Sequence, residues 1–459
     1  MRYKYVPLLH RLSHQNKIVM SISKKIAIIG DGYAAAVMAL HLLRRGISGS
    51  SIALVGPRVP GKGNAYSCAS SFFRLNVRED LPIIFSEDPL HFARWAENNV
   101  YDPESKTDAG YFYRRRDFGD YVTQLLQGTP GAMQMEHVAA RVKRLLPADG
   151  HWIITLEDGG NLCANQVIIA TGNAPPVWPC AVTSSVQSSA RMVENPWPGN
   201  YLDGIPRNDH VILLGGGLTA LDAINALAGQ GHQGMVSVIS PRAIFPPVQA
   251  LWERSKQPQF PQDLSPRRLV RFMRNYLPQV STDSVQWQSA WEELRPPLNA
   301  VWQQFSPHQR RRLLKRLGWI WSLYRFRASP QTIAAYECLR ARKQVQFVLG
   351  RAKQITCSES KVNVLMSSGS ELVGDWIINC TGVGSDSLTH QLVQSGIAAP
   401  DALLQSIAVD ADLRVINPDY QSHPNLWMIG PATMGSLGDV VASSAIAKQA
   451  EQLAQEIAK

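Results

Sequence analysis

Cysteine is scarce in this chain, and the cysteines that are present stand alone. None forms a Cys-x-x-Cys pair, and no group of Cys and His has the spacing of a zinc site. The pattern indicates neither a disulfide framework nor a metal centre, and we expect reduced thiols in a cytoplasmic protein. The 459 residues contain six: Cys68, Cys163, Cys180, Cys338, Cys357 and Cys380.

Long apolar runs are missing as well. No stretch approaches the roughly 18 residues that a membrane-spanning helix needs, so no transmembrane segment is expected. The first twenty residues are basic, contain no acid and lack the continuous apolar core of a signal peptide. We expect residues 1–22 to be a flexible tail, with the start of translation open between Met1 and Met20.

Acidic residues are nearly absent from one segment, which explains the overall charge of +10. Residues 306–345 hold ten Lys and Arg against one acid, Glu337, a net +9 that leaves the remainder near +1. The basicity is therefore local, and no nucleic-acid partner is expected. Its densest part, residues 310–327, has three readings: a helical surface paired with acidic neighbours, a contact to nucleotide phosphates or an anionic substrate, or a docking site for a membrane or acidic partner.

What is present begins with a strand, a glycine turn and a helix, KKIAIIGDGYAAAVMALHLLRRG (24–46), followed by a second strand at 51–56. The turn reads Gly30-x-Gly32-x-x-Ala35, and a small third residue lets helix and strand pack closely. Such a unit binds a dinucleotide pyrophosphate at the helix N-terminus. The acid expected to bind the adenosine ribose is missing, because Gly56 stands in its place. Arg58 follows closely, so a nucleotide with a 2′-phosphate stays open, although binding mainly through the pyrophosphate is preferred.

A second unit of the same kind occupies residues 209–242 and has the turn Gly215-x-Gly217-x-x-Ala220. Thr219 lies in this turn and is expected to contact the cofactor. Its second strand ends in Ser240-Pro241-Arg242, where a hydroxyl and a guanidinium suit a 2′-phosphate, which favours NADPH. The alternative is that Arg242 is a solvated surface residue.

Each unit is paired with a β-meander that ends in Thr-Gly. The first reads RVKRLLPADGHWIITLEDGGNLCANQVIIATG and ends at Thr171-Gly172; the second reads RAKQITCSESKVNVLMSSGSELVGDWIINCTG and ends at Thr381-Gly382. Two nucleotide sites in one chain indicate electron transfer between two cofactors, for which NAD(P)H and a flavin are the usual pair.

An ordered series of short motifs carries a family resemblance. GKGNAYS, LNV, LHFARWA, RRRDFGDY, IIATGNAPP, GGGLTALDA, YRFRASP, INCTG and MIGPATMG follow one another between about Ile26 and Ala458. In this order they resemble the FAD/NAD(P)-binding flavoprotein oxidoreductases, relatives of two-dinucleotide flavin monooxygenases that include amine N-hydroxylases. The resemblance implies FAD on the first unit, NADPH on the second, and a reaction in which NADPH reduces the flavin and O₂ forms a flavin peroxide that attacks a small-molecule substrate.

The resemblance also places individual residues near the flavin. It implies contacts from Gly61, Gly63, Tyr66, Asn76 and Gly430, and it makes the two Thr-Gly ends crossings between domains. Asn76 is the one catalytic candidate, bonding flavin or substrate, with a plain turn residue as the alternative. Asp439 is read either as the N-cap of the last helix or as a residue that presents that helix to the flavin. Arg115 and Arg116 would face a phosphate or an anionic substrate, or else solvent.

The predicted fold is α/β, with two Rossmann-like dinucleotide-binding domains, β-meander crossovers and a helical insertion. The domains are residues 23–200 plus 350–459 for FAD, and 201–349 for NAD(P)H, with a basic helical insertion at about 262–345. The predicted function is an FAD-dependent, NADPH-using monooxygenase acting on an amine or amino acid. An NAD(P)H-dependent reductase without oxygen insertion and a non-catalytic nucleotide-binding protein remain alternatives.

Overall fold

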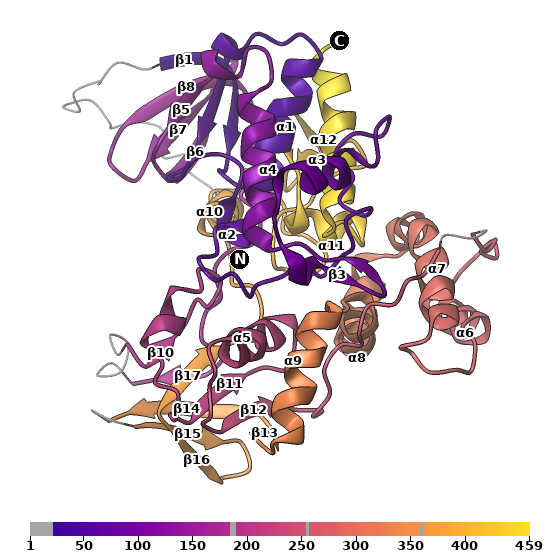
Figure 1. The fold of residues 1–459 in the computed structure, drawn as a ribbon. Helices are drawn as coiled ribbons and strands as arrows, with labels where there is room; N and C mark the ends of the chain where they lie inside the picture. Colours follow the sequence, from indigo (N-terminus) through magenta and orange to yellow (C-terminus); the bar gives the residue numbers. More distant parts are fainter. Residues whose placement is uncertain (1–21, 184–189, 254–256, 359–360) are drawn as a thin grey trace, which may run out of the picture.

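The computed structural model describes residues 22–183, 190–253, 257–358 and 361–459, so the predicted tail lies almost wholly outside them. Figure 1 shows two α/β units stacked one above the other, with a group of helices at their side. Within the described residues no helix is both long and apolar enough to cross a membrane.

The first unit is built on an eight-stranded sheet in the order β18-β19-β8-β1-β2-β5, to which β6 and β7 are joined at β8. β1 lies parallel between β2 and β8, and its apolar residues from Ile26 to Ile29 are almost completely buried. A run this apolar suits a strand that is covered on both faces. The strands are β1 (Ile22–Ile29), β2 (Ile52–Val55), β5 (Glu136–Val138), β6 (Val142–Ala148), β7 (His151–Leu156), β8 (Asn161–Ile169), β18 (Arg414–Ile416) and β19 (Ser422–Met428).

The helices of the first unit pack on this sheet and on one another. The first and last helices of the chain pack side by side near the C-terminus (Figure 1). The helices are α1 (Tyr33–Arg44), α2 (Gly63–Tyr66), α3 (His91–Asn99), α4 (Arg115–Gln127), α10 (Ser387–Gln394), α11 (Met434–Leu437) and α12 (Ser443–Ile457); a small hairpin joins β3 (Lys106–Thr107) to β4 (Gly110–Tyr111).

The second unit has a parallel sheet, β10-β17-β11-β12-β13, and a four-stranded sheet, β16-β15-β14-β9. Helices α5 (Leu218–Gly229) and α9 (Pro330–Ala341) pack against each other beside the parallel sheet. The strands are β9 (Ala181–Val182), β10 (Met192–Val193), β11 (Val211–Leu214), β12 (Val236–Ser240), β13 (Val345–Leu349), β14 (Ala352–Cys357), β15 (Val362–Met366), β16 (Glu371–Gly374) and β17 (Trp376–Asn379).

This strand pairing corrects the predicted division of the chain. Residues 350–380 were expected in the first unit, but β14 to β16 form their own sheet with β9 and β17 pairs with β11. Strands β9 and β10 also belong to the second unit, because β9 pairs with β14 and β10 with β17. The second meander resembles the first in sequence, yet its last strand, β17, pairs in parallel with β10 and β11 of the second unit.

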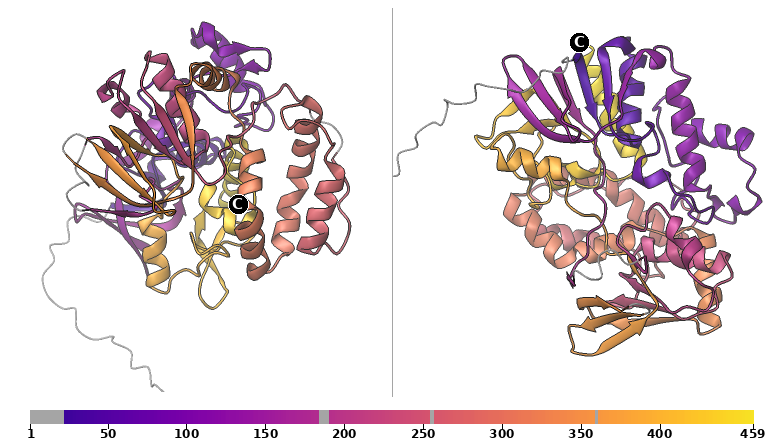
Figure 2. Two further views of the ribbon diagram at one scale, coloured as in Figure 1. Left: turned by 90° about the horizontal axis from the view of Figure 1, so that it is seen from below. Right: turned by 90° about the vertical axis from the view of Figure 1, so that its left-hand side faces the viewer.

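The helical insertion is shorter than predicted. It consists of α6 (Pro266–Tyr276), α7 (Val285–Gln304) and α8 (Pro307–Arg325), whereas α9 and β13 complete the second unit. A serine caps each insertion helix, and its hydroxyl accepts a hydrogen bond from an amide of the first turn. In α6 and α8 the serine is followed by a proline whose missing N–H costs nothing at that position. Figure 2 shows these helices beside the C-terminal segment.

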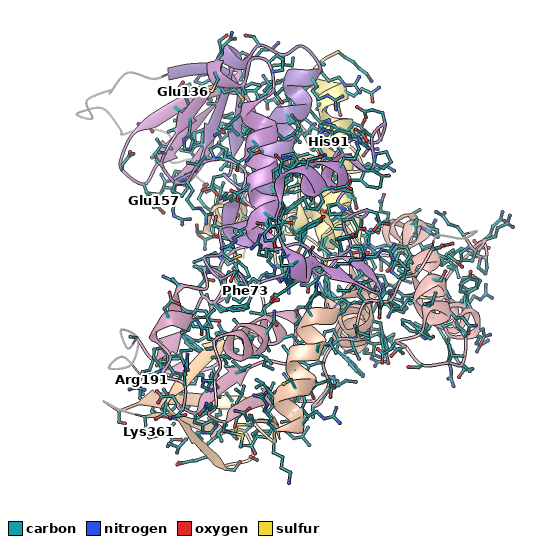
Figure 3. All side chains as sticks on the ribbon, in the orientation of Figure 1. Phe73, His91, Glu136, Glu157, Arg191 and Lys361 are labelled. Atoms are coloured by element: carbon teal, nitrogen blue, oxygen red, sulfur yellow. The ribbon has the colours of Figure 1, made fainter. Side chains whose placement is uncertain are left out.

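The two units share buried contacts. Cys68 and Phe73 come from the long loop of the first unit but pack in the core of the second, and Figure 3 shows Phe73 at the junction. The side chain of Asn225 donates to the carbonyl of Phe72 at 2.6 Å. The Phe72 ring lies so close to Gly229 that a Cβ there would collide with it. The interface is therefore packed like a core.

Candidate functional site

The two glycine turns have the same surroundings. Gly30 has φ 142° and Gly215 has φ 116°, a region that side chains disfavour. A Cβ on Gly30 would collide with the carbonyl of Ala170, and one on Gly215 would lie 2.5 Å from the carbonyl oxygen of Cys380. Each turn is thus pressed against the strand end that precedes a Thr-Gly pair, so the repeat seen in the sequence is also a repeat in space.

Each turn leads into a helix whose first amides have no side-chain cap. Gly32 is the N-cap of α1 and Gly217 is the N-cap of α5. Ala35 and Ala220 are completely buried, as expected for the small third residue. A glycine cap leaves the first-turn N–H groups available to an anion, and the helix dipole favours negative charge there. Thr219 is half-buried in the first turn of α5.

The predicted flavin loop lies against the first turn. A Cβ on Gly63 would lie 2.5 Å from the Cα of Gly32, and one on Gly61 would collide with Thr123 of α4. Gly61 also donates its amide to the carbonyl of Asp31 at 2.9 Å. Both glycines are therefore required for close backbone packing beside the first glycine turn.

Tyr66 belongs to an aromatic cluster. It meets Tyr33 and Phe118 edge-on, with ring centroids 6.1 and 4.9 Å away. Burial raises the pKa of its phenol to about 12, with attraction from Arg115 opposing that shift, so it stays protonated at neutral pH. Its position supports the packing of α1 and α4 around the turn.

Asp31, a residue of the first glycine turn, occupies the space where an acidic side chain at position 56 would lie. A Cβ on Gly56 would lie 2.7 Å from the Cβ of Asp31. The Asp31 carboxylate accepts from the amide, Nε and Nη2 of Arg58 at 3.0, 3.1 and 2.8 Å. Arg58 Nη1 donates to Asn64 Oδ1 at 2.7 Å. An acid therefore lies at the expected place, but it is paired with Arg58. Sequence reasoning missed this pair, although Asp31 stands inside the Gly-x-Gly motif.

Asn76 has an acceptor without a partner. Its Oδ1 is buried and has no hydrogen bond among the described residues. Two residues later, Arg78 donates to the carbonyl of Trp252 at 2.9 Å and lies over its ring. The segment therefore joins the first unit to the loop that precedes the insertion, and Asn76 offers an oxygen for an N–H group.

At the second unit, Ser240 is buried at the end of β12 and Arg242 is exposed. The guanidinium carbon of Arg242 lies 4.0 Å from the ring centroid of Trp319 on α8. This stacking orients Arg242 from a helix about 80 residues further along the chain, a partner that nothing in the sequence indicated.

The segments that contain the two Thr-Gly ends are joined by hydrogen bonds. Thr171 Oγ1 donates to Asp386 Oδ2 at 2.5 Å, and Thr381 Oγ1 donates to Asn379 Oδ1 at 2.6 Å. Asn379 Nδ2 in turn donates to the carbonyl of Val177 at 3.0 Å. The two connections therefore run together, and Gly172 and Gly382 turn with φ 70° and 117°. Both hydroxyls bond within the protein, so backbone groups are what these residues present to a cofactor.

Of the two C-terminal candidates, Gly430 and Asp439, the structure contradicts one reading of Asp439. Gly430 has φ 99°, and its amide donates to Gln449 Oε1 at 2.8 Å. Asp439 is not the N-cap of the last helix, because α12 begins at Ser443 after Ala442. Its carboxylate accepts instead from two buried guanidinium groups, those of Arg295 and Arg325.

Of the two arginines at the start of α4, Arg115 lies differently from the prediction. Arg115 Nη2 bonds Asp222 Oδ2 on α5 at 2.5 Å, which makes it an ion pair between the two units. Burial raises the pKa of Asp222, and attraction from Arg115 opposes that shift. Arg116 is half-exposed and has only a 4.0 Å contact with Asp117.

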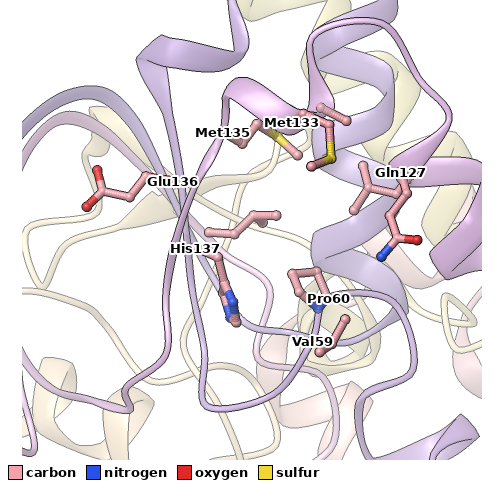
Figure 4. A pocket seen from close by; sticks show the side chains of 10 residues that line it. Val59, Pro60, Gln127, Met133, Met135, Glu136 and His137 are labelled. Atoms are coloured by element: carbon pink, nitrogen blue, oxygen red, sulfur yellow. The ribbon is translucent and has the colours of Figure 1, made fainter.

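Two concave regions lie on the outer side of the first unit. A pocket of about 120 Å³ is lined by Pro60, Met133, Met135 and His137 among others (Figure 4). His137 Nε2 lies 2.9 Å from the carbonyl of Gly56, so this pocket adjoins the Asp31–Arg58 position. A groove of about 670 Å³ lies between α1, α3 and α4.

Comparison with known proteins agrees with this geometry. Residues 27–174 match the family model described as FAD-NAD(P)-binding. Ornithine hydroxylase from Pseudomonas aeruginosa, in its reduced form, is 13% identical with a TM-score of 0.62, covering 95% of this chain and 99% of its own. Ornithine N-hydroxylase from Kutzneria sp. 744, with reduced FAD, NADP⁺ and L-ornithine, is 15% identical with the same TM-score and coverage. Thioredoxin reductase from T. acidophilum is 14% identical with a TM-score of 0.53, covering 96% of this chain and 100% of its own.

A search of curated proteins finds no match. At these identities the structural likeness establishes the fold, and the prediction of an α/β fold with two dinucleotide-binding domains is confirmed. Residues 27–174 therefore match the FAD-NAD(P)-binding family model, within a chain that has the two-unit fold of the solved structures named above.

Proposed function

We propose that the chain is an FAD-dependent, NADPH-using monooxygenase that oxidises a small molecule. The observation that carries the proposal is the pair of equivalent glycine turns, each pressed against a strand end that leads into a shared crossing. One chain then holds an electron donor and an electron acceptor in a defined arrangement.

We assign FAD to the first turn and NADPH to the second. The Asp31 carboxylate is paired with Arg58, so the first turn would hold its nucleotide mainly through the pyrophosphate. The second turn has Ser240 and Arg242 at the ribose position, and a guanidinium suits a 2′-phosphate.

Bound FAD would supply hydride uptake and oxygen activation. The N–H groups at the start of α1 would hold its phosphates, and Gly61 and Gly63 allow the loop to close against that turn. Asn76 Oδ1 would accept a hydrogen bond from flavin or substrate. The packed interface between the units would exclude water from the reacting groups.

For the substrate we propose an amine or an amino acid, in view of the ornithine hydroxylases with which the chain shares its fold. The second candidate function is an NADPH-dependent reductase, since thioredoxin reductases share the fold as well. The chain lacks a Cys-x-x-Cys pair, so a reductase of this kind would pass electrons to an acceptor other than its own disulfide.

We propose a cytoplasmic location and no role for the basic segment 310–327 in binding an acidic partner. Four of its arginines already bond within the protein: Arg310 to the carbonyls of Gly435 and Ser436, Arg311 to that of Ala402, Arg325 to Asp439 and Arg327 to Glu292. This supports the reading of a helical surface paired with its own neighbours.

The test begins with the flavin. The purified full chain should show a flavin spectrum or bind added FAD; a protein that stays colourless with FAD would contradict both enzyme functions. The loaded protein is then reduced with NADPH without oxygen, and air is admitted. Rapid reoxidation with oxygen uptake or hydrogen peroxide release supports the monooxygenase, whereas a reduced flavin that hardly reacts with oxygen supports the reductase.

A further inference from the structure

A buried cluster of charges lies where the insertion meets the C-terminal segment. Glu292 bonds Arg295 and Arg327, and Asp439 bonds Arg295 and Arg325. The cluster therefore contains three guanidinium groups and two carboxylates, which leaves one positive charge unmatched. All five side chains are at most 19% exposed.

Arg327 is the arginine of this cluster that has buried donors without an acceptor among the described residues. Its Nη1 donates to Glu292 Oε1 at 2.7 Å, but its Nε and Nη2 are buried and have no acceptor among the described residues. The residue is 4% exposed. Burial lowers the pKa of its guanidinium to about 10, with attraction from Glu292 opposing that shift, so it is charged at neutral pH. A buried charged donor without an acceptor bears the full cost of losing its hydration.

The two unpaired nitrogens form one geometric unit. Nε–H and the adjacent Nη2–H of an arginine point the same way and present two parallel donors, which match two oxygens of a carboxylate or phosphate. The cluster offers no further acid for this position, because Glu292 and Asp439 are already paired.

The loop from Pro247 to Trp252 connects Arg327 to the segment around Asn76, which is predicted to lie beside the flavin. Ala328, next to Arg327, bonds the carbonyl of Pro247 and accepts from Gln249 at 2.8 Å. The same loop continues to Trp252, whose carbonyl binds Arg78, two residues from Asn76. Indole N–H groups of Trp252 and Trp291 are likewise buried without an acceptor among the described residues. Several donors in the insertion and the loop before it thus lack a partner.

We propose that Arg327 is the anion-binding residue of a buried subsite between the insertion and the first unit, and that it takes a pair of anionic oxygens, as in a carboxylate. If the proposed function is right, those oxygens belong either to the substrate or to a phosphate of the nicotinamide cofactor. Only this choice of ligand rests on the proposed function; the subsite itself does not.

The test measures binding without turnover, on the full chain loaded with FAD. Sodium acetate and inorganic phosphate are titrated at constant ionic strength set by chloride, and the thermal unfolding midpoint is followed. We expect a saturable rise of the midpoint with at least one of the two anions. Arg327→Lys keeps the charge but removes the fork, and should weaken that binding by about tenfold or more. Arg312→Lys changes an exposed arginine on α8, the helix that precedes Arg327, and should bind like the parent.

The proposal is wrong if neither anion stabilises the parent protein, or if Arg327→Lys responds as the parent does. Should Arg327→Lys fail to fold, crystals of the parent grown without carboxylates and soaked in acetate decide the question: acetate on Nε and Nη2 supports the subsite, and a water alone overturns it. Competition with NADP⁺ separates the sources, because displaced acetate indicates a cofactor phosphate and simultaneous binding indicates a substrate carboxylate. A chain that binds acetate at Arg327 but is not reduced by NADPH would refute the proposed function and leave the subsite standing.

Discussion

Gly56 and Asp31 share one space at the end of β2. In the ordinary arrangement, an acid at position 56 would reach the adenosine ribose, whereas here the Asp31 side chain lies where a Cβ of residue 56 would be. Asp31 then binds Arg58 with both oxygens. The acid and its positive partner thus replace a single acid at the nucleotide-binding edge.

Gly56→Ala should therefore destabilise the protein by about 1–3 kcal/mol, because the new methyl group displaces Asp31 or the turn. It should also weaken FAD retention. Gly318→Ala is the matched control: its Cβ would meet only Leu314 at 3.4 Å, within α8. That change should stabilise the protein by about 0.5–1 kcal/mol. Urea unfolding of the two variants measures both effects, and a neutral Gly56→Ala would disprove the steric argument.

Arg242 is the residue on which cofactor choice is expected to depend. Its guanidinium stacks on Trp319 and is exposed, so a nucleotide phosphate could reach it. Arg242→Ala should weaken NADPH binding by about 10- to 100-fold and leave NADH binding unchanged. Stopped-flow reduction of the flavin at varied NADPH and NADH measures this, with the exposed Arg207→Ala as the control. Equal losses for both nucleotides would reject the 2′-phosphate assignment.

At the scale of elements, the insertion is joined to the first unit by its arginines and by Asn299. Asn299 Oδ1 accepts a hydrogen bond from the backbone amide of Asp439 at 2.8 Å. Arg295 and Arg325 both bind the carboxylate of Asp439. Burial by itself would raise the pKa of Asp439, but the attraction of Arg325 and Arg295 outweighs it and holds that pKa below its ordinary value. The pKa of Glu292 is lowered in the same way, burial being outweighed by Arg295, Arg327 and Arg325.

These shifts predict how stability depends on pH. The folded-state pKa lies below the unfolded one, so the stabilisation is fully present above about pH 4 to 5 and is lost as the pH falls through the folded value. Asp439→Asn should lower the free energy of unfolding by about 3–5 kcal/mol at pH 7, because it leaves two guanidinium groups buried beside an uncharged amide. The difference from the parent should shrink at pH 3.

Urea unfolding at both pH values measures this dependence. The exposed Asp412→Asn serves as control and should follow the parent at each pH. If the loss caused by Asp439→Asn were the same at pH 3 as at pH 7, the ion pairs would not be its cause.

At the scale of the whole molecule, two of the regions that join the two units stand out. One is the insertion; the other is the contact of α5 with the loop around Phe72 and with Arg115 of α4. The Arg115–Asp222 pair spans the interface, and Asp222 is almost fully buried. The two units should consequently unfold together.

Asp222→Asn should remove this coupling, because Arg115 loses its charged partner within the interface. We expect a loss of about 2–5 kcal/mol and a calorimetric transition that broadens or splits in two. Asp203→Asn changes an exposed acid of the same unit and should leave a single transition. Superimposable scans of Asp222→Asn and the parent would show that the pair does not couple the units.

The sequence by itself determined the local structure: the two glycine turns, the small residues Ala35 and Ala220, the meander repeat, and the Ser-Pro starts of α6 and α8. These follow from backbone conformation, periodicity and capping, which act over a few residues. Only the tertiary structure decided that strands β14 to β17 belong to the second unit, and which partners Asp439 and Arg115 take. Arg325 lies 114 residues before Asp439 in the sequence, and Asp222 lies 107 residues after Arg115. A charged side chain takes whichever opposite charge the packed backbone brings within reach, and no local pattern encodes that choice.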